Sequence, residues 1–229
     1  MNALPKTPGA LEPIGATGSG RANAATLLPC GDSGILAELE TLDQVLALFR
    51  ALSEPPAGVL DVVPAARTIL VTFDPERLEL TAVQNWLRSA EPVEAALADG
   101  PLVPIEVSYT GPDLAEVAQY LNLTVEQVVE LHTSSEWTAA FTGFAPGFAY
   151  LVTSHEKLRV PRRNTPRTSI PAGSVALGGE FSAIYPTSSP AGWQLIGHTA
   201  AVLWDASKSE AAGSPALITP GARVRFRAV

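Results

Sequence analysis

Apolar and polar residues in the first half of the chain follow the periods of short strands and two amphipathic helices. The first helix is expected to begin at Thr41, which can form a capping box with Gln44, and the second at Thr81. Runs of β-branched and aliphatic residues predict the strands, at residues 35–39, 59–63 and 68–73. This β-α-β-β-α order predicts a small α+β sandwich of ferredoxin-like type over residues 26–98.

The second half begins with the pattern of one strand and two short helices and continues with strands alone. The strand is expected at residues 102–109 and the helices at 113–121 and 124–132. After Trp137, closely spaced glycines and prolines separate short apolar runs. These runs predict strands at residues 148–152, 174–177, 182–185, 193–196, 201–204 and 223–226. The pattern predicts a β-barrel or compact sandwich over residues 99–229, with an early helical pair.

Composition and charge narrow the class of protein. Of 229 residues, 46% are hydrophobic, and a formal charge of -8 argues against binding to nucleic acid or to an anionic membrane. The second helix of the pair agrees, since it carries Glu126 and Glu130 but no Lys or Arg. The single cysteine, Cys30, leaves no internal disulfide and fits a reducing compartment. Residues 1–25 are expected to be a flexible segment without the features of a signal peptide, so we expect a cytoplasmic protein.

Three segments mix aromatic residues, glycines and prolines in a way that neither a helix nor a plain strand requires. They span residues 141–151, 161–179 and 189–199. Glycine permits positive φ and close approach of the backbone to a ligand, whereas proline fixes φ. In the first segment we expect a loop that faces a ligand, with a rigid turn burying its phenylalanines as the alternative. The residues expected at the ligand are Gly143, Phe144, Pro146, Gly147 and Phe148.

A basic run lies beside these segments. Five of the fifteen Lys and Arg residues fall within residues 157–167, where two prolines stiffen the chain. A local positive site on an acidic protein favours a small anionic ligand, such as a carboxylate or a phosphate. A solvated charged loop is the alternative. The candidate anion donors are Arg162, Arg163 and Arg167.

The chain contains three histidines, which are candidate catalytic groups or metal ligands. None has the spacing of a zinc site, so we expect no bound metal. His132 is expected to end a helix, where a cation favours the helix dipole, and His155 to be exposed in a polar turn. His198 is the best candidate for a general acid or base, with a structural role as the alternative. The chain has no phosphate-binding GxxxxGK[ST] and no GxSxG motif, which is consistent with one component of a composite active site.

The motifs GFAPGF, PRRNTPR, PAGSV and GWQLIG together resemble one known family. It includes the B subunit of bacterial ATP-dependent 5-oxoprolinase and is also described as allophanate hydrolase subunit 1, as carboxyltransferase subdomain C and D, and as KipI. The resemblance runs from about residue 31 to residue 226 and implies an N-terminal α/β domain followed by a cyclophilin-like β-barrel. Two departures are Ala149, where members commonly have Pro, and His198, where many have Arg.

The resemblance also implies partners and chemistry. The 5-oxoprolinase complex cleaves the lactam of 5-oxoproline to glutamate at the expense of ATP, which this chain or a partner subunit would hold. The expected partners are a homologous cyclophilin-like subunit, known as the C subunit, and a third, lactam-opening subunit. Within this chain, Phe144, Phe148 and Trp193 are expected to wall the substrate, the three arginines to bind its anionic groups, and Gln194 to orient it.

Two other functions remain open at this point. One is a urea-amidolyase-like half of a carboxyltransferase, which would move CO₂ from carboxybiotin in the same cleft. The other is a non-enzymatic inhibitor of a sensor histidine kinase, which would act through a protein–protein surface.

Overall fold

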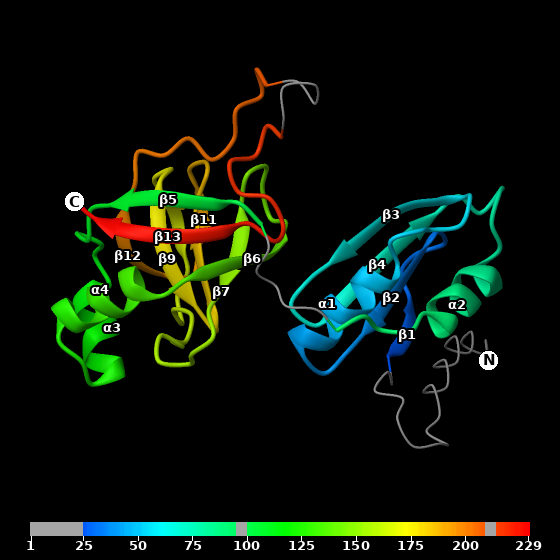
Figure 1. The fold of residues 1–229 in the computed structure, drawn as a ribbon, viewed down its shortest axis with the longest axis horizontal. Coiled ribbons are helices and arrows are strands. Elements are labelled where there is room, and N and C mark those ends of the chain that lie inside the picture. Colours follow the sequence, from blue (N-terminus) through cyan, green and yellow to red (C-terminus); the bar gives the residue numbers. More distant parts are fainter. Residues whose placement is uncertain (1–24, 95–99, 209–213) are drawn as a thin grey trace, which may run out of the picture. The chain divides into compact units, whose positions relative to one another are not determined.

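The computed structural model describes residues 25–94, 100–208 and 214–229. The chain divides into two compact units at Ala95/Ala96 (Figure 1). The expected flexible segment, residues 1–25, lies outside the described residues except for Ala25, as do residues 95–99 of the expected boundary. None of the described helices is long and apolar enough to cross a membrane.

The first unit is a four-stranded antiparallel sheet with two helices on one face. The expected strands are present as β2 (Gly34–Glu38), β3 (Val59–Pro64) and β4 (Thr68–Phe73). A strand that the pattern did not predict, β1 (Thr26–Pro29), pairs with β2, so the sheet order is β1-β2-β4-β3. The helices are α1 (Leu42–Ala51) and α2 (Leu80–Ser89), and their apolar sides share one core with alternate residues of the strands.

The two helix starts of this unit differ. Thr41 and Gln44 form the predicted capping box, which fixes the beginning of α1. The predicted start of α2 at Thr81 is wrong, since the helix begins at Leu80 with Glu79 at the cap position and no capping side chain. The Thr81 hydroxyl lies 3.4 Å from a Glu79 carboxylate oxygen instead. The backbone N–H groups of Ala82 and Val83 both donate to the Glu79 carbonyl oxygen, so the first helical turn begins one residue earlier than the sequence signal indicates.

The second unit is a nearly closed barrel, which confirms the barrel predicted for this half. Seven strands form one sheet in the order β12-β9-β10-β7-β6-β13-β5, and only β13 and β5 are parallel neighbours in it. The strands are β5 (Leu102–Val107), β6 (Trp137–Thr142), β7 (Ala149–Val152), β9 (Ser174–Gly178), β10 (Phe181–Ile184), β12 (Gln194–His198) and β13 (Arg223–Ala228). Ser108 and His198 close the barrel, because their backbones exchange two hydrogen bonds of 2.9 Å.

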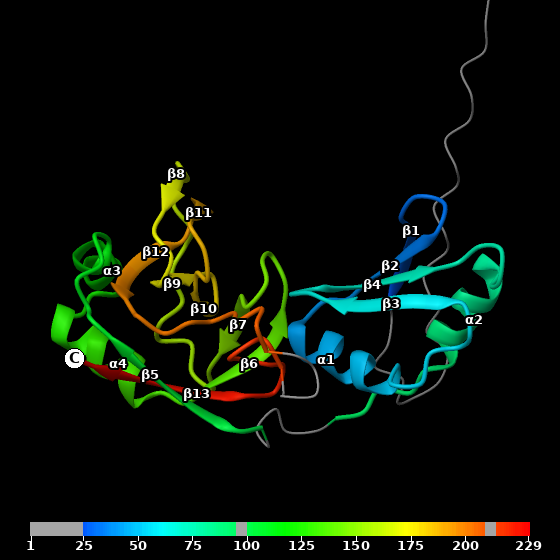
Figure 2. The ribbon, with the colours of Figure 1, turned by 90° about the horizontal axis from the view of Figure 1, so that it is seen from above.

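Two helices and a short ribbon complete this unit. α3 (Leu114–Leu121) and α4 (Val125–Ser134) bury their apolar sides in the barrel core, and α4 begins as expected after Thr124, which forms a capping box with Gln127. β8 (Arg167–Ile170) and β11 (Ser189–Ala191) pair with each other and project from the barrel in Figure 2.

One strand prediction in this half was wrong, and three strands, β6, β8 and β11, were not predicted. Residues 201–204 form no strand and make only an isolated bridge between Trp204 and Ala216. The strand β6, in contrast, was not predicted. Five of its six residues are buried, so it lacks the alternation that identifies a half-exposed strand.

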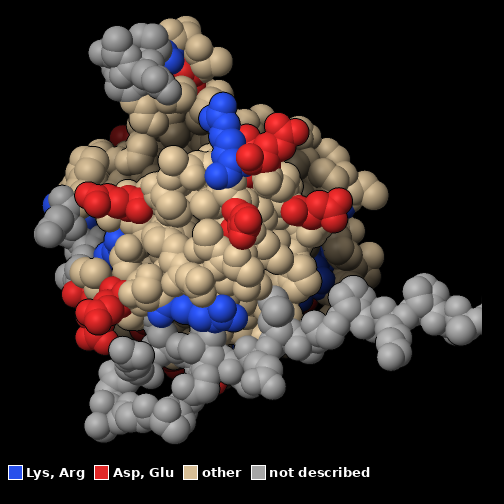
Figure 3. Space-filling model, turned by 90° about the vertical axis from the view of Figure 1, so that its right-hand side faces the viewer, with Lys and Arg blue, Asp and Glu red and all other residues tan. Residues whose placement is uncertain are grey.

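The distribution of charge agrees with an acidic protein. On the face shown in Figure 3, acidic side chains are scattered over a mostly uncharged surface, and the Lys and Arg side chains visible there lie apart from one another. Among the described residues on this face there is therefore no continuous basic stripe of the kind that follows a nucleic-acid backbone.

Candidate functional site

Four aromatic side chains of the barrel unit pack edge to face around one point, which we call the aromatic platform. Phe148 lies 5.0 Å from Tyr150 and 5.1 Å from Tyr185, measured between ring centroids, and Tyr150 lies 5.8 Å from Trp193. The rings come from β7, from the loop before it, and from residues flanking β10 and β12. Edge-to-face packing of this kind is favourable beyond its buried area and holds the rings in fixed orientations.

The loop between β6 and β7 places an additional ring on the platform. Phe144 has a φ of 69° and is 62% exposed, and it lies edge-on 5.1 Å from Phe148. Phe148 is 2% exposed, so the loop both buries one phenylalanine and presents the other. Burial of Phe148 fits the turn interpretation, and a role of Phe144 in the wall of a site stays a prediction.

Glycine is required at one position of this loop. Gly147 has a φ of 83°, and a Cβ there would lie 2.7 Å from the carbonyl oxygen of Leu203. At Gly143 a Cβ would meet nothing within 4 Å. Gly143 and Pro146 are both exposed, whereas Gly147 is buried and fixes how the loop packs.

Arg162 brings a positive charge to the platform. Its guanidinium carbon lies 5.6 Å from the centroid of the Trp193 ring, in the geometry of a cation–π contact. Its positive charge also acts to lower the pKa of both tyrosine side chains. Burial raises the pKa of Tyr185 to about 12, with a further increase from Tyr150, while Arg162 opposes the shift. Burial likewise raises the pKa of Tyr150, against the influence of Arg162. At neutral pH the platform thus offers one cation and two protonated phenols.

The other two candidate arginines are paired with a buried carboxylate. The carboxylate of Asp113 accepts hydrogen bonds from Arg163 Nη1 at 2.8 Å and from Arg167 Nη1 and Nη2 at 2.9 and 2.7 Å. It also accepts one from the backbone N–H of Leu195 at 2.7 Å. The Asp113 side chain is 3% exposed, and its hydrogen bond raises the pKa of Arg167 above the usual value. The prediction treated the three arginines alike, but the geometry commits two of them to a buried carboxylate.

The helix α3 begins as expected, but the Asp113 carboxylate does not cap it. Asp113 occupies the cap position but makes no capping hydrogen bond, because its side chain turns to the arginines instead. Nothing local in the sequence distinguishes these two uses of an aspartate, since its partners lie about fifty residues away in the chain.

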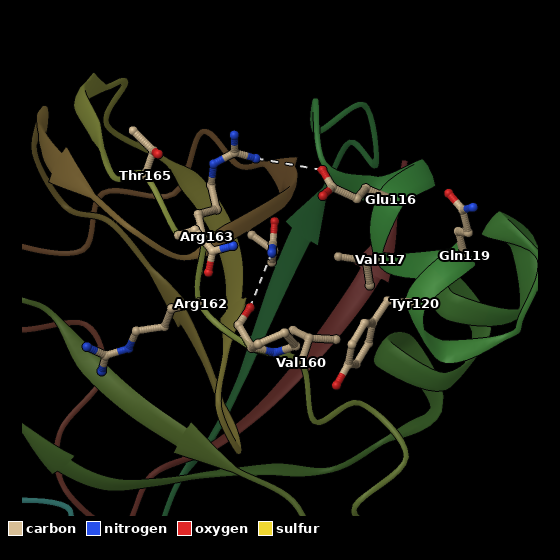
Figure 4. Close-up of a pocket in the computed structure, with 11 residues that line it drawn as sticks. Glu116, Val117, Gln119, Tyr120, Val160, Arg162, Arg163 and Thr165 are labelled. Atoms are coloured by element: carbon tan, nitrogen blue, oxygen red, sulfur yellow. Dashed lines mark hydrogen bonds and ion pairs between the residues drawn. The ribbon is translucent and has the colours of Figure 1, made fainter.

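A cavity of about 500 Å³ lies on the other side of the loop that carries Arg162. Figure 4 shows it between α3 and residues 160–165, with Tyr120 and Glu116 on one wall and Arg162 directed away from them. Gln194 lines this cavity and is 8% exposed. Its Nε2 donates to the carbonyl oxygen of Pro161 at 3.2 Å. Gln194 therefore faces this cavity, while its neighbour Trp193 belongs to the platform.

The histidines lie apart from the platform or serve the core. His132 is fully buried, with Nδ1 2.7 Å from the Tyr109 hydroxyl and Nε2 2.9 Å from Ser182 Oγ. Burial lowers its pKa to about 3, so it is neutral, and the expectation of a cation at a helix end was wrong. His155 is half-buried rather than exposed, with Nε2 2.6 Å from Ser135 Oγ.

His198 is exposed at the end of β12 opposite to Gln194. The two lie four residue steps apart along the strand, a distance of roughly 13 Å. Its Nε2 lies 3.1 Å from the carbonyl oxygen of Ala172, and its backbone closes the barrel. These contacts fit the structural alternative, and a catalytic role for His198 stays a prediction. Among the described residues, no group of three His, Cys, Asp or Glu side chains is placed to hold a metal ion.

Sequence reasoning did not single out Tyr150, Tyr185 or Asp113. Tyr150 stands in the GFAPGFAYL segment, and it could have been found there as a polar ring two positions after Phe148. Tyr185 follows an ordinary strand, and no pattern in the chain marks it.

Comparison with known proteins identifies the family of this chain. The family model for the carboxyltransferase domain, subdomain C and D, matches residues 25–213. A protein from Escherichia coli O157:H7, named as the B subunit of 5-oxoprolinase, is 40% identical over 206 residues, covering 86% of this chain and 92% of that protein. One of the same name from Bacillus subtilis is 32% identical and covers 86% of this chain and 89% of the relative.

A solved structure shows the same fold at lower similarity. The crystal structure of the Kluyveromyces lactis urea carboxylase superposes with a TM-score of 0.72 at 20% identity, covering 95% of this chain and 23% of that one. The family model covers the described residues of the first unit and most of those of the second. The chain belongs to the carboxyltransferase-domain family, subdomain C and D.

Proposed function

We propose that this chain is the B subunit of an ATP-dependent 5-oxoprolinase, which hydrolyses the lactam of 5-oxoproline to glutamate together with a homologous C subunit and a third, lactam-opening subunit. The observation that carries this proposal is the 40% identity to the E. coli O157:H7 protein of that name, over 92% of its length. Subunits of that kind act within an assembly, so the chain is expected to be inactive alone.

The aromatic platform supports a role in binding an anionic substrate. Arg162 supplies the cation, Tyr150 and Tyr185 supply neutral donors, and Trp193 supplies a flat wall. Because Arg163 and Arg167 are bound by Asp113, Arg162 is the arginine of the three that we assign to the substrate carboxylate or to a phosphoryl group.

The chemistry that such a site would assist follows from the stability of an amide. Transfer of the terminal phosphoryl group of ATP to the lactam oxygen releases ADP and makes the carbonyl carbon electrophilic. Water then adds to that carbon, and the C–N bond breaks as the ring nitrogen takes up a proton, which leaves an acyl phosphate. A second water hydrolyses the acyl phosphate to the carboxylate of glutamate and free phosphate. An arginine beside the reacting group stabilises the negative charge that develops on oxygen.

The exposed ring of Phe144 fits a site that a partner completes. It is 62% exposed beside a largely buried aromatic group, and a second protein placed over it would exclude water from Arg162. We assign ATP to the assembled complex, in which this chain or a partner holds it.

The test is glutamate release that depends on ATP and 5-oxoproline, measured with the three purified subunits and then with this chain omitted. Omission should abolish release, and Arg162→Met should reduce it by about 100-fold or more. Arg159→Met is the matched control, because Arg159 lies three residues away and pairs with Glu180 at 2.6 Å on the surface. Undiminished release without this chain, from a well-folded complex, would rule out the proposed role.

A second function is favoured by the description of the family itself, a carboxyltransferase domain. In that case the platform would receive the ureido ring of carboxybiotin, and carboxyl transfer would replace glutamate release as the activity of the complex. Assaying the same purified subunits with carboxybiotin separates the two functions. Inhibition of a sensor kinase stays a hypothesis that binding to a purified kinase would test.

A further inference from the structure

Arg162, the arginine assigned to the substrate, has few contacts that would hold its side chain in place. It is exposed, and among the described residues its guanidinium forms no hydrogen bond and no ion pair. Its contact with the Trp193 ring is weak by itself at an exposed position, and a loosely held arginine samples many rotamers. The orientation of Arg162 over the ring therefore depends on the backbone that carries it.

Two short stretches of chain, residues 161–163 and 192–194, lie side by side at this point. Arg162 is the middle residue of the first stretch and Trp193 is the middle residue of the second. The guanidinium carbon of Arg162 lies 5.6 Å from the centroid of the Trp193 ring, so each stretch contributes one member of the cation–π pair. Whatever fixes one stretch against the other therefore fixes the cation over the ring.

Hydrogen bonds join the two stretches at both ends. Gln194 Nε2 donates to the carbonyl oxygen of Pro161 at 3.2 Å. The backbone N–H of Arg163 donates to the carbonyl oxygen of Gly192 at 2.7 Å. Two single hydrogen bonds leave the first stretch able to turn about the line that joins them, so a further anchor is needed to fix the side chain at its middle.

The buried carboxylate of Asp113 supplies this anchor. It accepts a hydrogen bond at 2.8 Å from Nη1 of Arg163, which belongs to the first stretch. It accepts another at 2.7 Å from the backbone N–H of Leu195, which directly follows the second stretch. Figure 4 shows the side chains of Arg162 and Arg163 leaving their segment in different directions, so one arginine anchors the segment while its neighbour stays free for a ligand. We propose that Asp113 is a positioning residue, which holds Arg162 over the platform by tying both stretches to one buried group.

Charge and position predict opposite effects when Asp113 is replaced. Removal of a carboxylate near an anion site makes the local potential more positive, so electrostatics alone predicts that Asp113→Asn strengthens the binding of an anionic substrate. The positioning role predicts weaker binding, because Arg162 would leave the orientation that binds the substrate, and a small displacement of a binding group lowers the rate by a large factor. As a statement about the substrate, this role rests on the proposed function. The position of Arg162 over Trp193 is nevertheless measurable without turnover.

The first measurement is NMR of the arginine side chains in the isotope-labelled full chain. The ring current of an indole moves the signals of a group above its face to high field, so the Arg162 signals should be displaced, and Arg162→Met assigns them. Asp113→Asn and Arg163→Met should both remove this displacement. Arg167→Met should keep it and is the matched control, because Arg167 pairs with the same carboxylate and is 27% exposed against 28% for Arg163, but lies outside the two stretches. Equal effects of the Arg163 and Arg167 substitutions would overturn the proposal.

The second measurement is the kcat/KM of the assembled complex for 5-oxoproline. Asp113→Asn should lower it by about tenfold or more, whereas Glu116→Gln, which removes an exposed acidic neighbour of Arg163, should leave it unchanged. In an Arg162→Met background, Asp113→Asn should have little further effect, because a positioning residue acts only through the side chain that it positions. A merely structural role would instead give additive losses. Additive losses, or a higher kcat/KM in Asp113→Asn, would overturn the proposal. If Asp113→Asn does not fold, Arg163→Met takes its place in both measurements.

The positioning role and the proposed function can fail separately. If the Arg162 signals change as expected but the complex of unaltered subunits releases no glutamate, Asp113 does position Arg162 and the 5-oxoprolinase function is wrong. If the complex releases glutamate but the Arg162 signals are the same in Arg163→Met as in the unaltered chain, the proposed function holds and the positioning role is wrong.

Discussion

Replacement of Asp113 tests whether Arg163 and Arg167 are structural residues or ligand-binding residues. In Asp113→Asn the side chain keeps its size but loses its charge. Its amide NH2 group, itself a donor, then faces N–H groups that donate to the carboxylate in the unaltered protein. The Asp113 side chain is 3% exposed and accepts four hydrogen bonds from three residues. The substitution therefore leaves two cations facing a neutral group in a largely dry site.

The expected loss can be worked out from these contacts. Breaking a buried ion pair by removing one partner costs about 3–5 kcal/mol. The Arg163 and Arg167 side chains are 28% and 27% exposed, so water can recover part of their lost interaction. We therefore expect a cost near the lower limit, about 3 kcal/mol, which is a large fraction of the stability of a typical domain.

The assay is urea unfolding followed by tryptophan fluorescence, since Trp137 and Trp193 both lie in the barrel unit. The matched control is Glu116→Gln, because Glu116 approaches the same Arg163 at 3.8 Å but is 69% exposed, and this change should cost no more than about 0.5 kcal/mol. A double-mutant cycle of Asp113→Asn with Arg167→Met measures the coupling between the two side chains. If Asp113→Asn costs less than about 1 kcal/mol, the two arginines are not held by this carboxylate, and the argument that leaves Arg162 as the substrate arginine fails.

Three further outcomes are expected. The unfolded chain binds a proton at His132 near pH 6.5, whereas the native state excludes it down to a pKa of about 3. The free energy of unfolding should therefore decrease as the pH is lowered, by about 2 kcal/mol between pH 6.5 and 5. His132→Gln should lessen this pH dependence in urea titrations. Gly147→Ala should cost about 2 kcal/mol in thermal unfolding because of its positive φ and its contact with the Leu203 carbonyl, whereas Gly143→Ala should cost little, and equal costs would contradict this. Tyr185→Phe should raise the KM of the complex for 5-oxoproline about tenfold and leave the melting temperature unchanged, while an unchanged KM would exclude its hydroxyl from the site.

Local signals determined the helices and most of the strands of this protein. The capping boxes at Thr41 and Thr124 are formed by residues three positions apart, so the sequence contains both partners of each contact. The predicted start at Thr81 failed because α2 begins at Leu80 after Glu79, which makes no side-chain capping hydrogen bond and so leaves no capping signal in the sequence. Strand β6 was missed because burial on both faces removes the alternation on which such a prediction depends.

The candidate site was predicted only in part, because local patterns do not show which distant side chains meet. The aromatic and basic segments pointed to Phe148, Trp193 and the group of three arginines, since their composition is unusual for a helix or a strand, but they did not distinguish Arg162 from the other two. That Asp113 binds Arg163 and Arg167, and that Tyr185 joins Tyr150 and Trp193, was decided by the closed barrel alone. Side chains tens of residues apart meet only when the sheet brings their strands together, and their charges and hydrogen bonds then depend on that contact rather than on any local pattern.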